Sequence, residues 1–104
     1  MIKQTQQLWL EQDGEIVTIG LTPSLQDEAG DIAYASIAPL GKIEVDDTLL
    51  VLEASKASIE VASPLSGQIV ERNQAAEGKP SLLNETDSSA NWLVKMTQVD
   101  TNLL

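Results

Sequence analysis

Turn-forming residues interrupt this sequence so often that it cannot form a long helix or a long strand. Glycine or proline recurs about every eight to twelve residues. The segments between them are short and rich in β-branched and other apolar residues, which favour strands. No segment carries the sustained three- and four-residue apolar spacing of a long amphipathic helix. The pattern therefore predicts an all-β sandwich or barrel.

The turns also set the expected element boundaries. Asp13-Gly14 is a dipeptide typical of a hairpin turn between two strands. Residues 75–80 are polar and indicate a loop, whereas residues 81–84 indicate a helical turn. The expected extended segments are 7–11, 15–21, 31–37, 42–47, 49–52, 58–62, 68–72 and 91–96.

One short helix is expected over residues 22–30. Thr22 can cap its N-terminus, Pro23 fits its first turn, and Gly30 can end it. Apolar residues at helical spacing should then face inward and acidic residues outward. The expected inward residues are Leu21, Leu25 and Ala29, and the expected outward residues are Asp27 and Glu28.

Length and charge narrow the class of protein further. The 104 residues, 42% of them apolar, are enough for one domain, residues 1–104, with a packed core. Sixteen acidic residues against six basic ones give a formal net charge of -10. Nucleic acids and anionic membranes are bound through basic patches, so neither is an expected partner. An acidic surface suits contact with basic patches on other proteins.

The residue types that are absent exclude several chemistries. The chain has no Cys and no His, which removes thiol nucleophiles, Ser-His triads, disulfides and ordinary zinc sites. No acidic pair converges on a site, and Asp46-Asp47 alone is a weak metal signal, so we expect no enzyme activity and no metal. The longest apolar run, Leu49 to Leu52, is too short to span a membrane, and no secretory signal is visible. We expect a cytoplasmic protein.

The aromatic residues, Trp9, Tyr34 and Trp92, are expected in the core.

Lys56 is the only basic residue between Lys42 and Arg72. Because strands are expected on both sides of it, Lys56 should lie at the tip of their connection. Its neighbours Ala54, Ser55, Ala57 and Ser58 are small, which leaves the amine open to a modifying enzyme. A single lysine in a turn is ordinarily just a solvated side chain. The surrounding sequence pattern therefore has to distinguish such a lysine from a modification site.

That pattern resembles the lipoyl-attachment segment of glycine cleavage system H proteins. In that family the modified lysine follows a Glu by three positions and precedes a Ser-Pro-x-Ser-Gly turn and an Asn. Glu53, Lys56, residues 63–67 and Asn73 match this order. The resemblance extends over about residues 8 to 100, and its other matching segments are 8–10, 19–22, 30–31, 80–84 and 91–95.

The resemblance implies a biotinyl/lipoyl-type barrel-sandwich hybrid with one or two short helices. It also implies lipoate joined to Lys56 by an amide, as a swinging arm that visits partner sites at high effective concentration. Glu53, Ser55 and Ala57 are then the residues recognised by a lipoate-protein ligase or lipoyl transferase. The protein itself would be a non-catalytic carrier.

Three departures separate the chain from classical H proteins. No His precedes Trp9, residues 85–90 replace a Pro-Tyr-Gly segment, and the chain stops at Leu104 without a longer helical tail. Residues 51–56 instead resemble the Ile-Glu-Ala-Ser-Lys segment of the H-like branch. That branch implies lipoate relay and/or lipoylation-dependent ADP-ribosylation in an oxidative-stress response. A sirtuin-type ADP-ribosyltransferase and a macrodomain hydrolase would be the partners, with Asp27 as the first expected acceptor and Glu28 as the second.

Three alternatives remain. A classical H protein would shuttle the aminomethyl group between glycine decarboxylase and aminomethyltransferase, and 2-oxoacid dehydrogenase components are further potential partners. A biotin carrier usually has Met on both sides of its lysine, where this chain has Ser55 and Ala57. An acidic interaction domain without any cofactor would carry a bare Lys56.

Overall fold

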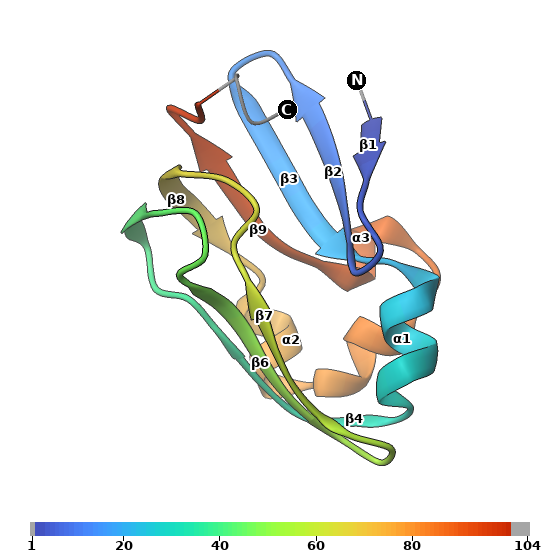
Figure 1. Cartoon of the computed structure of the whole chain (residues 1–104). Helices are drawn as coiled ribbons and strands as arrows, with labels where there is room; N and C mark the ends of the chain where they lie inside the picture. Colours follow the sequence, from blue (N-terminus) through green and yellow to red (C-terminus); the bar gives the residue numbers. More distant parts are fainter. Residues whose placement is uncertain (1, 101–104) are drawn as a thin grey trace.

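Two antiparallel sheets form the framework of the computed structural model, which describes residues 2–100 (Figure 1). The six-stranded sheet has the order β1-β2-β3-β9-β8-β5, and the three-stranded sheet has the order β4-β6-β7. The strands are β1 (Ile2–Gln4), β2 (Leu8–Asp13), β3 (Ile16–Leu21), β4 (Ile32–Ile37), β5 (Gly41–Ile43), β6 (Thr48–Ala54), β7 (Ser58–Ala62), β8 (Gly67–Arg72) and β9 (Trp92–Thr97). The expected all-β, barrel-sandwich class is confirmed.

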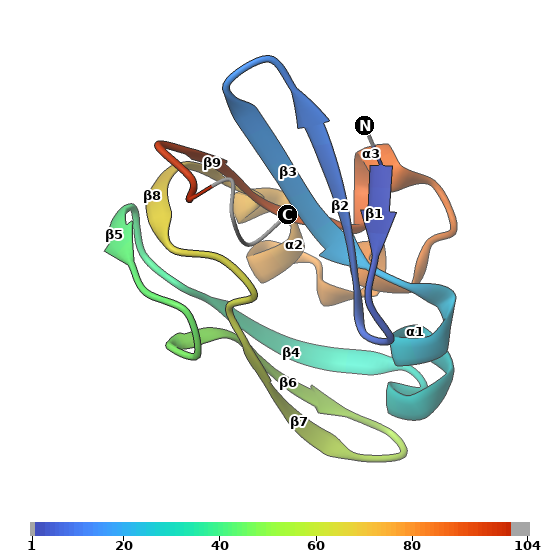
Figure 2. The ribbon, with the colours of Figure 1, turned by 45° about the horizontal axis from the view of Figure 1, so that its top comes forward.

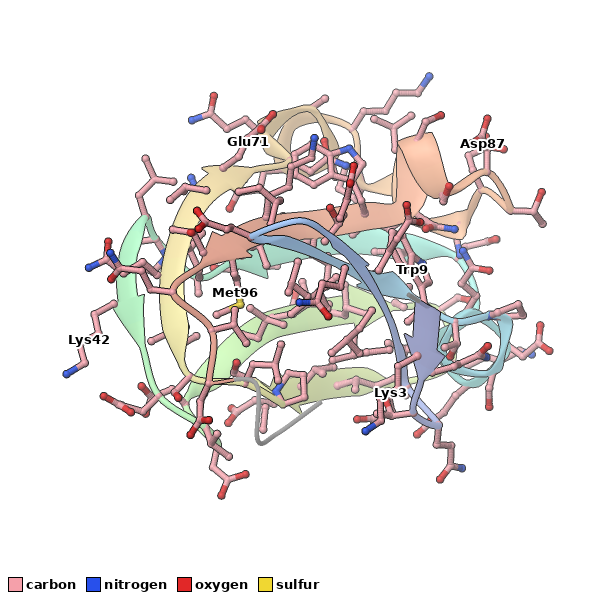
Figure 3. The ribbon with its side chains drawn as sticks, turned by 90° about the horizontal axis from the view of Figure 1, so that it is seen from above. Lys3, Trp9, Lys42, Glu71, Asp87 and Met96 are labelled. Carbon is pink, nitrogen blue, oxygen red and sulfur yellow. The ribbon has the colours of Figure 1, made fainter. Side chains whose placement is uncertain are left out.

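The core lies between the two sheets, which face one another in Figure 2. Leu50 and Leu52 alternate with more exposed residues along β6, and both are fully buried. Ile19 and Met96 contribute from the six-stranded sheet and are equally buried. Figure 3 shows the Met96 side chain in the middle of the molecule. Burial of these apolar faces is the main term that stabilises such a fold.

The predicted helix is present as α1 (Pro23–Ala29). The Thr22 hydroxyl accepts a hydrogen bond from the Leu25 N–H at 3.2 Å, which is the expected N-terminal cap. Gly30 ends the helix with a φ of 75°, a conformation that side chains disfavour. The inward and outward faces are also as predicted, because Leu25 and Ala29 are buried and both acids are exposed.

The estimate of one or two short helices was too low, and the loop predicted at 75–80 was wrong. That segment lies largely in α2 (Gln74–Gly78), whose first turn is capped by the Asn73 side chain through the Ala76 N–H. The helical turn predicted at 81–84 is part of the 3₁₀ helix η1 (Pro80–Asn84). A third helix, α3 (Ser88–Asn91), and strand β1 had no counterpart in the prediction.

Asp87 caps α3. The Ser89 N–H and the Ser89 hydroxyl donate hydrogen bonds to its carboxylate, each at 2.9 Å. These bonds hold the pKa of Asp87 below its ordinary value, because they stabilise the ionised form.

No helix within residues 2–100 is long and apolar enough to cross a membrane.

A partly buried ion pair connects the two sheets at one end. Arg72 on β8 contacts Glu77 on α2 at 2.7 Å and donates to the backbone carbonyls of Ile37 and Ala38, each at 2.9 Å. The second Glu77 oxygen accepts from the Ile37 N–H at 3.1 Å. Through these bonds α2 is held against the end of β4.

The aromatic residues are not in the core, contrary to the prediction. Tyr34 is 51% exposed, and the two tryptophans are half-buried. Trp9 and Trp92 are the cross-strand neighbours of Gly20 on β2 and β9. The Trp9 indole covers Gly20 so closely that a Cβ there would overlap the ring. Its Nε1 donates to Asn91 Oδ1 at 3.0 Å, so Trp9 and Gly20 form a surface packing unit.

Candidate functional site

Lys56 lies at the tip of the β6–β7 hairpin, as the flanking strands predict. Glu53 and Ser58 form the last registered pair, and the Ala54 N–H donates to the Ala57 carbonyl at 3.0 Å to close the turn. Lys56 itself is exposed. The turn therefore presents a primary amine at one corner of the molecule.

The main chain of this tip is anchored to the segment that follows α1. The Ser55 N–H donates to the Asp31 carbonyl, and the Asp31 N–H donates back to Ser55 Oγ, both at 2.9 Å. The Lys56 N–H donates to the Ala29 carbonyl at 2.9 Å. Figure 1 shows the hairpin tip beside the end of α1. Three hydrogen bonds thus fix the base of the lysine while its side chain stays at the surface.

The Lys56 side chain crosses Gly30 toward the last turn of α1. Its Nζ donates to the Asp27 carbonyl at 3.2 Å, where the negative end of the helix dipole favours a cation. A Cβ on Gly30 would lie 2.5 Å from Ser55 Oγ and 2.9 Å from Lys56 Cγ. Sequence reasoning assigned Gly30 only to the end of the helix. Its second role, close approach of the hairpin, has no local sequence signal.

The other predicted recognition residues share the hairpin with Lys56. Ser55 uses its hydroxyl to accept from the Asp31 N–H, so it has a structural role in the anchor. Ala57 is half-buried, and Glu53 is exposed on β6. The two candidate acceptors, Asp27 and Glu28, are exposed on the neighbouring helix. The structure therefore brings all six predicted residues to one corner.

Asn84 supports this corner and was not singled out as a site residue. Its Oδ1 accepts from the Ile32 N–H at 2.9 Å, and its Nδ2 donates to the Gly30 carbonyl at 2.7 Å. These bonds hold both ends of the connection between α1 and β4 that receives the hairpin. An Asn after a helical turn gives no sign in the sequence of which distant backbone it contacts.

The remaining motif residues act away from Lys56. Ser63 is buried and its hydroxyl donates to the Leu65 carbonyl at 2.6 Å within the Ser-Pro-x-Ser-Gly turn. Asn73 is also buried, and its Nδ2 donates to the carbonyls of Ala90 and Trp92. This part of the motif stabilises turns and the β8–β9 end of the large sheet.

A shallow surface hollow of about 280 Å³ lies between α1, β2 and α3. Trp9 and Gln26 line it, together with Thr86 and Ser88 from the segment that departs from classical H proteins. A second hollow of about 430 Å³ is lined by residues of the β2–β3 turn and of the chain after β9. Neither hollow is lined by Lys56.

A two-sheet β fold that presents one anchored, exposed lysine at a hairpin tip defines a carrier domain of the biotinyl/lipoyl class. The family model for the glycine cleavage H-protein matches residues 1–103. The chain belongs to the glycine cleavage H-protein family, in its H-like branch.

Three known proteins illustrate the relationship. The glycine cleavage system H-like protein of Staphylococcus aureus is 41% identical over 100 residues, which cover 96% of this chain and 91% of that protein. The glycine cleavage system H protein of Bartonella tribocorum is 38% identical over 93 residues, covering 88% and 76%. The crystal structure of a glycine cleavage system H protein from Mycobacterium marinum has a TM-score of 0.80 at 23% identity and covers 92% of this chain and 81% of that one, which supports the fold.

Members of this family carry lipoate on a lysine and serve as carriers for glycine cleavage components. The chain is therefore a lipoyl carrier of the H-protein type.

Substitution of Gly30 tests the anchor. Gly30→Ala should lower the melting temperature more than Gly14→Ala, because Gly30 combines a backbone conformation open almost only to glycine, φ 75° and ψ −150°, with atoms in the space that a methyl group needs, whereas that space is empty at Gly14. Strain at such a position costs about 1–3 kcal/mol, and the contact with Ser55 and Lys56 adds to it. Thermal unfolding followed by circular dichroism measures both variants. Equal losses would show that the hairpin moves aside without cost.

Proposed function

We propose that Lys56 carries lipoate on its Nζ and presents it as a swinging arm to partner proteins. The observation that carries this proposal is the exposed Nζ at the tip of an anchored hairpin, three residues after Glu53. Within residues 2–100 no carboxylate forms an ion pair with Lys56, so its amine is held only by the Asp27 carbonyl. The residues present therefore fit an attached lipoyl group.

Attachment needs only a nucleophilic amine. The neutral Nζ attacks the carbonyl carbon of an activated lipoyl group, the activating group leaves with the bonding electron pair, and Nζ releases one proton to solvent or to the ligase as the secondary amide forms. A bound lipoyl group supplies a disulfide that can accept electrons and a transferred group. The chain supplies the fixed hairpin base and loses one positive charge beside the end of α1.

Lys56→Arg tests the attachment site. After incubation with a lipoate-protein ligase, lipoate and ATP, the unmodified chain should gain the mass of one lipoyl group, and Lys56→Arg should gain none. Arginine keeps the charge but does not form this amide. Lys42→Arg is the matched control, since Lys42 is also exposed, and it should be modified like the unaltered protein. Modification that persists in Lys56→Arg would contradict the assignment.

We further propose that the carrier serves lipoate relay or a regulated response, with classical glycine cleavage as the second candidate. The match to a protein named H-like extends over 96% of this chain and 91% of that protein, and this full-length likeness supports the first role. Thr86 and Ser88 line the hollow beside Trp9 where a classical family member has a different segment, and no His precedes Trp9. A less sheltered aminomethyl intermediate would be lost faster to water.

Turnover with the glycine system distinguishes these two roles. With the decarboxylase, aminomethyltransferase and lipoamide dehydrogenase, the lipoylated protein should release at least about tenfold more formaldehyde per CO₂ than a classical H protein does. The physical reason is hydrolysis of the unsheltered aminomethyl intermediate to formaldehyde, ammonia and the free thiol. Formaldehyde and ¹⁴CO₂ from carboxyl-labelled glycine are measured in the same reaction. Equal ratios would favour the classical role, and transfer of the lipoyl group to a 2-oxoacid dehydrogenase subunit would independently support relay.

The acidic residues beside Lys56 suggest how modification could be regulated. Asp27 and Glu28 are exposed on α1, and the Asp27 carbonyl is the acceptor for Lys56 Nζ. Amide formation removes the cation from this helix end, which changes the local charge. We propose Asp27, and after it Glu28, as acceptors of ADP-ribose from a sirtuin-type transferase, with a macrodomain protein as the hydrolase.

Asp27→Asn tests the acceptor. In the lipoylated protein, with Lys56 loading verified by intact mass, this change should abolish ADP-ribose incorporation from labelled NAD because an amide cannot form the ester. Glu28→Gln should leave the label in place. A label that survives in Asp27→Asn but disappears in Glu28→Gln would move the acceptor by one residue. A label that survives in both would place it elsewhere.

A further inference from the structure

The outer face of the β4-β6-β7 sheet is open beside Lys56. Side chains on these strands alternate between the core and this face. Leu52 and Val61 point inward and are buried, whereas Tyr34, Glu53, Ser58 and Glu60 are exposed. The large exposed fraction of Tyr34, 51%, is unusual for one of only three aromatic residues in the chain.

Strand register brings these exposed residues together. Tyr34 on β4 is the neighbour of Glu53 on β6, and Glu53 is the neighbour of Ser58 on β7. Val51 and Glu60 form a registered pair farther from the tip. Glu53 precedes Lys56 by three residues, so the row formed by Tyr34, Glu53 and Ser58 lies within about 10 Å of the lysine along the chain. We call Tyr34, Glu53, Ser58 and Glu60 the hairpin ledge.

The ledge is the open side of the hairpin. The inner side packs into the core through Leu52 and Val61, and the tip is hydrogen-bonded to Ala29, the last residue of α1, and to Asp31 after it. A protein that encloses Lys56 Nζ in its own active centre therefore has the outer face available for contact.

The chemistry of the ledge defines its partner. Glu53 and Glu60 form no ion pair within residues 2–100, and the Thr48 hydroxyl donates to Glu60 Oε1 at 3.0 Å and orients it. Two exposed carboxylates on a chain of net charge -10 complement a basic surface. Tyr34, next to Glu53 on β4, offers apolar area and a hydroxyl at small entropic cost, the properties of an interface anchor.

We propose that the hairpin ledge is the docking surface for the enzyme that acylates Lys56. That enzyme places basic side chains opposite Glu53 and Glu60 and receives Tyr34 in an apolar recess. This inference rests on the proposed function, because it names the surface by which the modification of Lys56 is selected. It adds Tyr34 and Ser58 to the hairpin residues expected from the sequence to be recognised.

Truncation of Tyr34 is the primary test. With a lipoate-protein ligase, lipoate and ATP, Tyr34→Ala should lower kcat/KM for the carrier about tenfold, mainly through KM, which is the scale of an interface anchor. Tyr34→Phe should stay within about twofold because it keeps the ring. Val70→Ala is the matched control, since Val70 is 47% exposed on β8 in the other sheet, and it should leave kcat/KM unchanged. Circular dichroism melting verifies that each variant is folded.

Removal of the two carboxylate charges tests the electrostatic part of the proposed docking. The double variant Glu53→Gln/Glu60→Gln should lower kcat/KM at low salt by about tenfold and flatten its dependence on ionic strength. Asp13→Asn/Glu15→Gln removes two exposed charges at the β2–β3 turn and should retain the salt dependence of the unaltered protein. Equal slopes for the two double variants would show that net charge, not the ledge, guides docking, and would overturn the proposal.

The outcomes separate this inference from the proposed function. If Lys56 is not lipoylated in the unaltered protein, the proposed function fails. If Lys56 is lipoylated and folded Tyr34→Ala reacts as fast as Val70→Ala, only the docking surface fails. Analytical ultracentrifugation tests whether a second copy of this chain covers the ledge instead. If the unaltered chain is a dimer and Tyr34→Ala is a monomer, the ledge is a dimer interface and the proposal is overturned.

Discussion

The apolar layer between the two sheets is the interaction on which the other features depend. The chain contains no cysteine, so no disulfide supports its fold. Ile19 and Met96 on one sheet and Leu50 and Leu52 on the other are withdrawn from water together. Each sheet alone would expose a continuous apolar face. With the sheets packed together, the tip of the β6–β7 hairpin lies beside the end of α1 (Figure 1).

The carrier site combines a fixed base with an exposed side chain. Backbone hydrogen bonds from Ser55 and Lys56 to the segment after α1 order the tip, and Asn84 orders that segment from behind. An ordered tip lowers the entropy that a partner must remove when it binds. Beyond Gly30 the lysine side chain is at the surface, where its Nζ donates one hydrogen bond, to the Asp27 carbonyl.

The family motif therefore contains residues with different physical roles. Lys56 is the proposed attachment residue at the surface, whereas Ser63 and Asn73 satisfy backbone groups away from it. Gly20 accommodates the Trp9 indole, and Gly30 accommodates the hairpin. Fold and family membership do not by themselves specify which partners a carrier meets. The surface around the site has to make that selection, and in this chain the open surface is acidic with one exposed aromatic ring.

The sequence by itself determined the local elements and the position of the lysine. The cap at Thr22, the Asp13-Gly14 turn and the short apolar strands are local signals, and they predicted α1 and the two main hairpins correctly. The strands expected on both sides of Lys56 likewise placed it at a hairpin tip. Local signals also misled: residues 75–80 looked polar and loop-like, yet the Asn73 cap starts α2 there.

Only the tertiary structure decided which distant backbone each side chain meets. Folding brings Gly30 against Lys56 and Asn84 against the backbone after α1. It also brings Glu77 of α2 to Arg72 and to the end of β4. No local sequence pattern encodes these contacts. The exposure of Tyr34 and the half-burial of the tryptophans depend on which sheet faces cover one another. The sequence singled out Lys56 because its flanking strands, its small neighbours and the family motif around it are all local in the chain, whereas its anchor to the end of α1 and the exposed face beside it required the packing of two sheets.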